Sequence, residues 1–322
     1  MNHRMRVRRP CVFQRNVFPG VCLVVLLLLP LTAAAQVVIT LNNTFIEEFK
    51  DRATIDTMFT VDRAHAKPNS PSKDGDLHVA GRAPEVQLPI VAELMNAKAQ
   101  KPAMKRIHSV EGGDEGIAVA GAWRLWSEHG GESHQVQGKA LKRFTKTNPD
   151  HVFEIHPITK VDDFNVAGSF RPIRGFKPKD AENAFTKYES KRCKIVPGAN
   201  GTTTIVTSMV GFNYVEFIME VLDEQPHVQP PDGRFVFASV HALNGELLVH
   251  KRRMVFVEGT PPARAVAGLK AGDRLHVLGI PRISLKLISW RIEHFKDDEF
   301  KDLDMLNWDL PYEMIIVAVY PR

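Results

Sequence analysis

Two short segments of the sequence hold the residue types that could do chemistry. Each carries an acidic residue followed two positions later by a histidine: Asp76 and His78 in the first, Glu154 and His156 in the second. Side chains two apart in a β-strand point to the same face, so each pair shares one face of its strand. If the two strands are neighbours, two imidazoles and two carboxylates converge. Such a set suits a bound ligand, a general acid–base pair, or zinc or another divalent metal. The pattern favours a polar face turned to solvent, and a ligand face or a metal site is the alternative.

The chain resembles a group of proteins around these same segments. The stretches are Ser72-Lys-Asp-Gly-Asp-Leu-His-Val-Ala-Gly-Arg-Ala-Pro84, Leu88-Pro-Ile-Val-Ala-Glu-Leu-Met-Asn96 and Phe153-Glu-Ile-His-Pro-Ile158. They resemble uncharacterised exported bacterial proteins that share a DGD-x-H segment followed, some tens of residues later, by an E-[IL]-H-P segment. The resemblance covers about residues 44–165 and implies an OB-like barrel there. It brings no known activity and no assigned functional residues.

Two tryptophans and a polar loop are further candidates for ligand contact. Trp123 and Trp126 lie three apart in a predicted strand, so they face opposite sides. One ring should therefore be in the core, and the other could stack on a base or a sugar. Core packing of both rings, through a bend or bulge, is the favoured interpretation. The loop 128–134 carries two histidines and two glutamates, but its spacing matches no zinc motif and we expect an exposed loop.

The sequence contains no recognised catalytic signature. The GxSxG nucleophile elbow, the GxxxxGK[ST] phosphate loop and the GxGxxG dinucleotide motif are all missing. We therefore expect a non-enzymatic binding or interaction protein, without a cofactor, whose partner is a ligand or an envelope protein. One alternative is a metal-assisted hydrolase of a phosphate ester or nucleic acid, with a divalent metal at Asp76, His78, Glu154 and His156. A structural envelope protein is the other.

Turn signals and apolar periodicity predict many short strands and a few helices. A capping box, with Thr44 as N-cap and Glu47 at N3, predicts a helix over 45–53. Asp180 is placed to cap another helix over 181–189. The remaining predicted elements are a helix over 88–99 and strands over 36–41, 54–64, 76–80, 117–126, 152–158, 202–210, 214–222, 234–243, 246–257, 272–280, 284–292 and 314–320.

Many short strands with one or two helices per half favour two small β-barrels. The five-stranded oligonucleotide/oligosaccharide-binding barrel, the OB-fold, fits both halves, and one larger β-sandwich is the alternative. We therefore predict a mostly β protein with an OB-like barrel domain over 36–165 and a second β-rich domain, which the OB-fold also fits, over 166–322. The segment 160–174 is the predicted crossing between them.

The first 35 residues have the layout of a secretory signal peptide. Five arginines precede or border the apolar stretch Val21 to Leu31, and three alanines lead up to Gln36. This pattern predicts cleavage between Ala35 and Gln36. The apolar stretch is shorter than the ~20 residues of a membrane span. We therefore expect a secreted or periplasmic protein without a permanent span, and a membrane tether by an uncleaved signal is the alternative.

The net charge changes when this segment is left out. The whole chain has 42 basic and 37 acidic residues, but residues 1–35 contain five arginines and no acid, which leaves 37 of each. General binding to nucleic acid depends on a net basic face, so the formally neutral charge argues against nucleic acid as a partner. Cys193 is the single cysteine after Gln36, so this part of the chain forms no internal disulfide.

Overall fold

The structure is a computed structural model that describes residues 36–223, 225, 229–294 and 308–321. The predicted signal peptide and Ala35, on one side of its predicted cleavage site, lie outside these residues. Residues 34–322 group into one compact unit. Within the described ranges, no helix combines the length and the apolar character that crossing a membrane requires.

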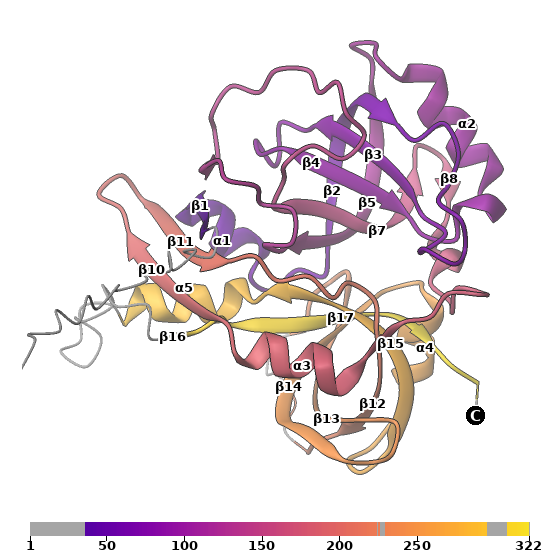
Figure 1. Cartoon of the computed structure of the whole chain (residues 1–322), viewed down its shortest axis with the longest axis vertical. Coiled ribbons are helices and arrows are strands. Elements are labelled where there is room, and N and C mark those ends of the chain that lie inside the picture. The colour runs from indigo at the N-terminus through magenta and orange to yellow at the C-terminus, as the bar shows by residue number, and fades with distance from the viewer. Residues whose placement is uncertain (1–35, 224, 226–228, 295–307, 322) are drawn as a thin grey trace, which may run out of the picture. The chain divides into compact units, whose positions relative to one another are not determined.

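The first barrel is a five-stranded sheet that closes on itself (Figure 1). Its strands are β2 (Thr54–Ala64), β3 (Leu77–Arg82), β4 (Ile90–Leu94), β5 (Gly116–Leu125) and β7 (Phe153–Val161). They follow the order β4-β3-β2-β5-β7, and parallel pairing of β4 with β7 closes the ring. The short strand β8 (Phe164–Asn165) pairs with β7.

The second barrel has the same number of strands and also closes. Its strands are β12 (Val215–Val221), β13 (Gly233–His241), β14 (Leu247–Val257), β15 (Arg274–Ile283) and β17 (Tyr312–Val319). They follow the order β13-β14-β17-β15-β12, and antiparallel pairing of β12 with β13 closes the ring. The short strand β9 (Lys179–Asp180) pairs with β12. Two closed barrels confirm the predicted mostly β architecture and exclude one large sandwich.

A third sheet joins the two halves of the chain. Its strands are β16 (Trp308–Asp309), β10 (Arg192–Pro197), β11 (Thr202–Ser208), β1 (Gln36–Asn42) and β6 (Gln135–Val136), in that spatial order. Strand β1, at the start of the predicted first domain, pairs antiparallel with β11 of the second half. The strand pairing therefore crosses the predicted boundary at residue 165, and the segments lie together in Figure 1.

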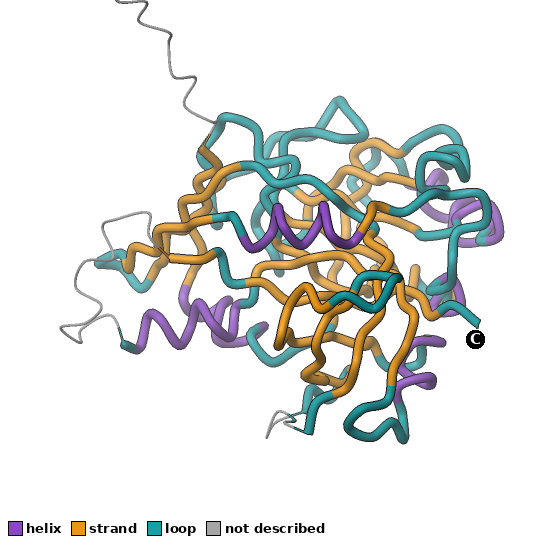
Figure 2. The backbone as a smooth tube through the Cα atoms, turned by 60° about the horizontal axis from the view of Figure 1, so that its bottom comes forward, coloured by secondary structure: helices purple, strands orange, loops and turns teal. Residues whose placement is uncertain are grey.

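Helices are few and short, as Figure 2 shows. They are α1 (Asn43–Phe49), α2 (Lys101–Val110), α3 (Ala181–Glu189), α4 (Pro261–Val266) and α5 (Leu285–Glu293), with 3-10 turns η1 (Ala97–Ala99) and η2 (Ala167–Ser169). Helix α3 has the predicted bounds, and the Asp180 side chain accepts a hydrogen bond from Asn183 N, 3.0 Å away. The turn at Asn244-Gly245 joins β13 and β14, with φ +91° at the glycine.

Three predicted elements are wrong in type or extent. The helix predicted over 88–99 is instead β4 followed by η1, because β4 is buried on both faces and its apolar run has no alternation. The strand predicted over 284–292 is helix α5, which buries Leu285 and Ile288 one turn apart. Helix α1 begins two residues before the predicted helix and ends earlier, and its N-cap makes no side-chain hydrogen bond.

The two barrels pack against each other through an apolar layer. Met95 and Ala122 of the first barrel contribute to it, with Phe235, Leu278 and Ile315 of the second, and all five side chains are fully buried. Burial of side chains of this kind is the main favourable term in folding. The faces of the barrels that meet in this layer are therefore closed to solvent, and any polar group among them needs a partner inside the protein.

Candidate functional site: a buried polar cluster between the barrels

The two sequence segments that carry acids and histidines come together at this layer. Asp76 lies directly before β3, and Glu154 and His156 lie on β7. Strand β4 separates β3 from β7 in the sheet, and its Glu93 pairs across from His78. Asp76 and His156 are fully buried, and Glu93 and Glu154 are nearly so. The predicted residues therefore converge, but the gap between their strands is filled by a glutamate that the sequence reasoning missed.

His156 lies at the centre of this group. Its Nδ1 is 3.2 Å from Glu154 Oε2 and 3.4 Å from Glu93 Oε2. Its Nε2 is 3.6 Å from Asp76 Oδ2. Three carboxylates, from β4, β7 and the residue directly before β3, thus surround one imidazole. We call Asp76, Glu93, Glu154, His156 and Tyr214 the polar cluster.

Tyr214 closes the polar cluster from the second half of the chain. It directly precedes β12, and its side chain is buried. Its hydroxyl donates a short hydrogen bond to Asp76 Oδ2 and lies 2.8 Å from His156 Nε2. The expectation of a polar face turned to solvent is therefore wrong, because the second half of the chain covers this face.

The hydrogen-bond geometry determines the charge on His156. The Tyr214 hydroxyl donates its proton to Asp76, so the Tyr214 oxygen accepts a hydrogen bond from His156 Nε2. His156 Nδ1 faces two carboxylate oxygens, one from Glu154 and one from Glu93. Both ring nitrogens are then donors, which describes an imidazolium. Burial alone would lower the pKa of His156, but the Glu93 carboxylate and hydrogen bonds to Asp76 and Glu154 raise it to about 10. Burial raises the pKa of Asp76 to about 6.

Arg124 supplies the second buried cation beside the polar cluster. It lies on β5, is fully buried, and donates to Glu154 Oε2 at 2.5 Å and to Glu128 Oε2 at 3.1 Å. Burial opposes ionisation of Glu154, but the Arg124 guanidinium holds the pKa of Glu154 well below its usual range. Arg124 Nε also donates to Pro281 O of the second barrel, 2.9 Å away. The same side chain therefore balances a charge and bridges the barrels.

His78 lies at the edge of the polar cluster and not within it. Its Nε2 is 3.6 Å from Glu93 Oε2, its ring stacks on His65 with centroids 4.8 Å apart, and its Nδ1 has no hydrogen-bond partner. Asp74 lies 3.9 Å from the same Nε2. His78 is the one predicted site residue of the four that keeps a partly exposed side chain.

Residues of the polar cluster could serve as ligands to a metal ion. Their existing hydrogen bonds show whether these ligand atoms are available. Asp76, Glu93 and His156 each have a potential ligand atom, all within 4.8 Å of one another. Glu154 and His78, which the sequence suggested as ligands, are not in that group. A histidine ligates a metal through a nitrogen lone pair, but both His156 nitrogens already face acceptors or a tyrosine hydroxyl. The imidazolium thus occupies the position that a cation would take.

The expectation that both tryptophans pack in the core is confirmed, and the alternative of one exposed ring is wrong. Trp123 and Trp126 are both buried. The Trp123 ring lies 3.5 Å from the Arg282 guanidinium, and Trp126 packs edge-on against Tyr188. Both contacts come from the second half of the chain, which covers the side of β5 that an isolated barrel would expose. Neither ring is available to stack on a base or a sugar.

The loop 128–134 also contributes to structure. Glu128 pairs with Arg124, His129 stacks on His151 with centroids 5.0 Å apart, and His134 Nε2 lies 2.8 Å from Thr40 Oγ1. Its histidines therefore contact different neighbours and do not gather at one point.

A second buried charge network links the barrels elsewhere. Arg282 on β15 is fully buried and donates to Glu313 Oε1 at 2.6 Å, and Arg253 donates to the other oxygen of Glu313. Arg282 also donates to backbone carbonyls of the first half, at Ala53 (3.3 Å), Trp123 (3.1 Å) and Arg52 (3.1 Å). Arg124 reaches from the first barrel into the second, and Arg282 reaches in the opposite direction. We call these two residues the crossed arginines.

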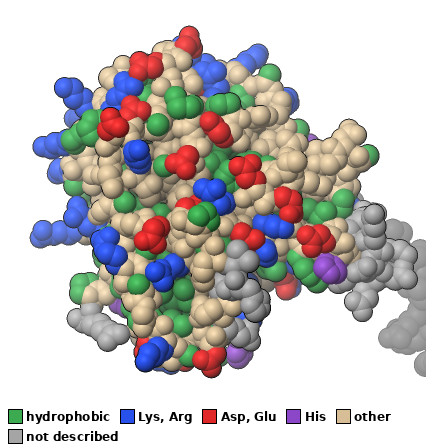
Figure 3. Space-filling view, turned by 180° about the vertical axis from the view of Figure 1, so that it is seen from behind, with side chains coloured by type: hydrophobic (Ala, Val, Ile, Leu, Met, Phe, Trp, Pro, Cys, Tyr) green, Lys and Arg blue, Asp and Glu red, His purple; other side chains and the backbone are tan. Residues whose placement is uncertain are grey.

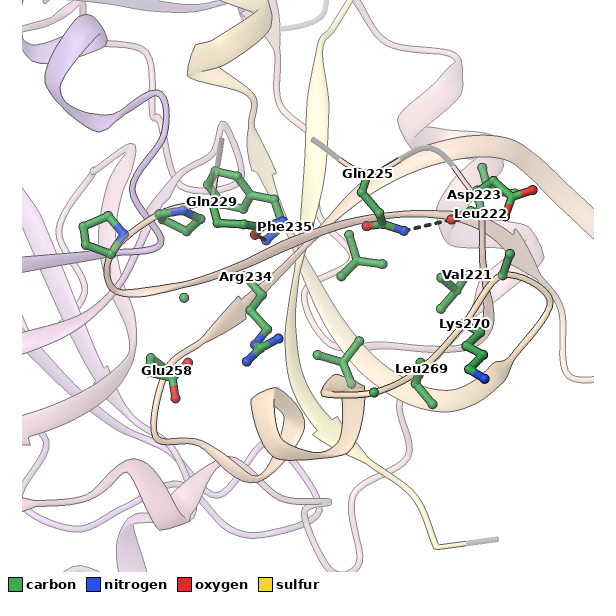
Figure 4. A pocket seen from close by; sticks show the side chains of 17 residues that line it. Val221, Leu222, Asp223, Gln225, Gln229, Arg234, Phe235, Glu258, Leu269 and Lys270 are labelled. Atoms are coloured by element: carbon green, nitrogen blue, oxygen red, sulfur yellow. Dashed lines mark hydrogen bonds between the residues drawn. The ribbon is translucent and has the colours of Figure 1, made fainter. Parts of the chain in front are cut away.

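A large cavity lies in the second barrel. It has a volume of about 650 Å³ between the ends of β12 and β13 and the α4–β15 connection. Its lining includes Arg234 and Lys270 but also Asp223 and Glu258, so it has no preference for one sign of charge (Figure 4). The surface in Figure 3 likewise intersperses acidic and basic side chains.

Replacing Tyr214 with phenylalanine tests the closure of the polar cluster. Tyr214→Phe leaves Asp76 Oδ2 without its donor and His156 Nε2 without its acceptor. A buried polar group without a partner costs about 1–3 kcal/mol, so we expect the free energy of unfolding to fall by about that amount in urea titrations. Tyr320→Phe is the control, because the Tyr320 ring stacks on His276 at the surface. Equal stability of both variants would show that the Tyr214 bonds contribute nothing.

Comparison with known proteins does not assign the chain to a family. No family model matches it, and no curated protein matches it. Among solved structures, a chain of a replication protein A heterotrimer bound to ssDNA aligns at 8% identity and a TM-score of 0.19. The alignment covers 71% of this chain and less than half, 44%, of that one. A structure described as "Structural mimicry for functional antagonism" aligns at 8% identity and a TM-score of 0.17 over 74% of this chain and 90% of that chain. Superpositions this poor support no conclusion about function.

Proposed function

We propose that this chain is an exported, non-enzymatic binding or interaction protein, in which the polar cluster holds the two barrels in a fixed arrangement. One observation carries the proposal. The residues best suited to chemistry, Asp76 and His156, are fully buried, and Tyr214 covers them from the second half. Export rests on the layout of residues 1–35.

A general acid, a general base or a catalytic metal must reach its substrate. His156 already donates to groups of the protein from both nitrogens, and Asp76 and Glu154 accept from Tyr214 and Arg124. Each of these hydrogen bonds would have to break before a substrate could replace it. Broken bonds of this kind are costly when the groups stay buried. The arrangement therefore supports a structural role for the polar cluster and leaves binding to the exposed surfaces.

The competing function is a metal-assisted hydrolase, which the close approach of Asp76, Glu93 and His156 favours. We expect the purified protein to show no hydrolysis of phosphomonoester, phosphodiester or carboxylic ester substrates above the uncatalysed rate with added Zn²⁺, Mn²⁺ or Ca²⁺. Measuring the bound metal of the same preparation gives a second readout, with less than one ion per ten chains expected.

The matched variants for this assay are Asp76→Asn and His78→Ala, with His134→Ala as a control on the loop. Folding of each is checked by circular dichroism. Turnover that Asp76→Asn or His78→Ala abolishes in a folded protein, while His134→Ala retains it, would overturn the non-enzymatic proposal.

A further inference from the structure

A second pocket lies beside the DGD-x-H segment and is separate from the polar cluster. It has a volume of about 430 Å³, within the range of small-molecule sites. Three chain segments form it: the loop after β2, the turn at η1, and the segment that follows η2. Pro68, Pro71 and Ile173 give it apolar walls. Gly75 lines this pocket while the next residue, Asp76, lies in the polar cluster.

The charged side chains at this pocket all have one sign. Lys67, Lys98, Arg171 and Arg174 line it, and its lining contains no carboxylate. The nearby Asp74 is held by the Asn69 amide, which donates to it at 2.9 Å. Four cations brought together without an acid repel one another, so an anion placed among them is attracted by all four. We call these four residues the basic rim.

The arginines of the basic rim are unusual within this protein. Among the described residues, all arginine side chains except three make a hydrogen bond or an ion pair. The exceptions are Arg171, Arg174 and Arg234. Two of these three line the same pocket. Arg234 lines the larger cavity, where Glu258 offsets its charge. The guanidinium donors of Arg171 and Arg174 are therefore free to bind a ligand, and a guanidinium matches carboxylate and phosphate geometry.

The walls of the pocket are joined by hydrogen bonds. Asn96, with a left-handed backbone (φ +52°), donates from its amide to Ser169 O at 2.9 Å and to Arg171 O at 3.0 Å. Ala97 N donates to Gly75 O at 3.2 Å. A Cβ on Gly75, where φ is +73°, would lie 3.4 Å from Ile173. The three segments are thus fastened to one another, so little order has to be gained when a ligand binds.

We infer that this pocket binds a small polyanion, a compound carrying two or more phosphate or carboxylate groups on a compact body. The basic rim supplies the charge and the guanidinium donors, the prolines and Ile173 supply apolar contact, and the volume limits the size. The inference rests on the proposed function, because it gives a binding protein its ligand class.

The experiment uses two probes on the purified protein, inorganic pyrophosphate and citrate, in calorimetric titrations at low salt. At least one should bind at one site per chain, and which of them binds more tightly distinguishes a phosphate ligand from a carboxylate ligand. Arg171→Gln/Arg174→Gln should weaken that binding at least tenfold. Raising NaCl from about 0.05 M to about 0.3 M should also weaken it, because salt screens exposed charges.

The matched control is Arg234→Gln/Lys270→Gln, which removes the same charge from the larger cavity and should keep binding within about twofold. Equal weakening by both double variants, or no binding of either probe, would overturn the inference and leave the non-enzymatic proposal intact. Release of phosphate from pyrophosphate would overturn the non-enzymatic proposal instead. In that case, retained dependence of binding on Arg171 and Arg174 would still support the pocket.

Discussion

Glu313→Gln should destabilise the protein more than any other single isosteric substitution considered above. Glu313 is fully buried and is the shared acceptor of Arg282 and Arg253. An amide in its place leaves two buried guanidinium groups with no negative charge between them. Breaking a buried ion pair costs about 3–5 kcal/mol. We therefore expect a loss of that size in the free energy of unfolding and a fall in Tm on the order of 10 °C.

The control for this substitution is Glu220→Gln. Glu220 also pairs with an arginine, Arg274, but both side chains are partly exposed, and such pairs contribute less than about 1 kcal/mol. Chemical denaturation of the three proteins makes the comparison. A loss from Glu313→Gln no larger than that from Glu220→Gln would contradict the role given to the crossed arginines, since Arg282 reaches the first half only from its place beside Glu313.

Stability should fall as the pH rises from about 6.5 towards 10. Burial, the largest influence on His156, lowers its pKa, but Glu93, Asp76 and Glu154 outweigh it and raise the folded pKa from 6.5 to about 10. The folded state therefore holds a proton that the unfolded chain releases above pH 6.5. The stabilisation is complete below pH 6.5 and is lost as the pH approaches 10. We expect a loss of about 3–5 kcal/mol, at up to about 1.4 kcal/mol per pH unit.

Urea titrations across this pH range measure the slope, and His156→Gln should flatten it. His276→Gln is the control, because His276 pairs with Glu216 at the surface and should keep the slope of the unchanged protein. Burial also raises the pKa of Tyr214, so its ionisation falls above this range. A slope that persists in His156→Gln would assign the pH dependence to another group and remove the imidazolium from the polar cluster.

Strands with one buried and one solvated face could be predicted from the periodicity of their apolar residues. In β11 the buried and partly exposed residues alternate along the whole strand, which is the pattern that sequence periodicity detects. In β4 all five residues are buried, so alternation is lost and the spacing of its apolar residues imitates a helix.

The polar cluster could be predicted in part, because residues two apart on a strand share one face. The spacing of Asp76 with His78 and of Glu154 with His156 places each pair on one face, and the fold brings three of these four residues together. Glu93 could not be assigned, because β4 was not recognised as a strand. Tyr214 could not be assigned, because it comes from the other half of the chain. A charge inside an apolar run, as at Arg124 and Glu313, is the signal that indicates a buried partner.

Strand β1 has a consequence for the order in which this protein can fold. Its Thr40 hydroxyl bonds that of Thr204, 164 positions later in the chain, and its ladder with β11 cannot form before that later segment exists. Contacts between residues so distant in sequence close a long loop and slow folding. A growing chain therefore carries β1 with an unsatisfied edge for most of its synthesis. The third sheet can therefore join β1 to β11 only after the first barrel has been synthesised, and β16 can pair with β10 only after most of the second barrel as well.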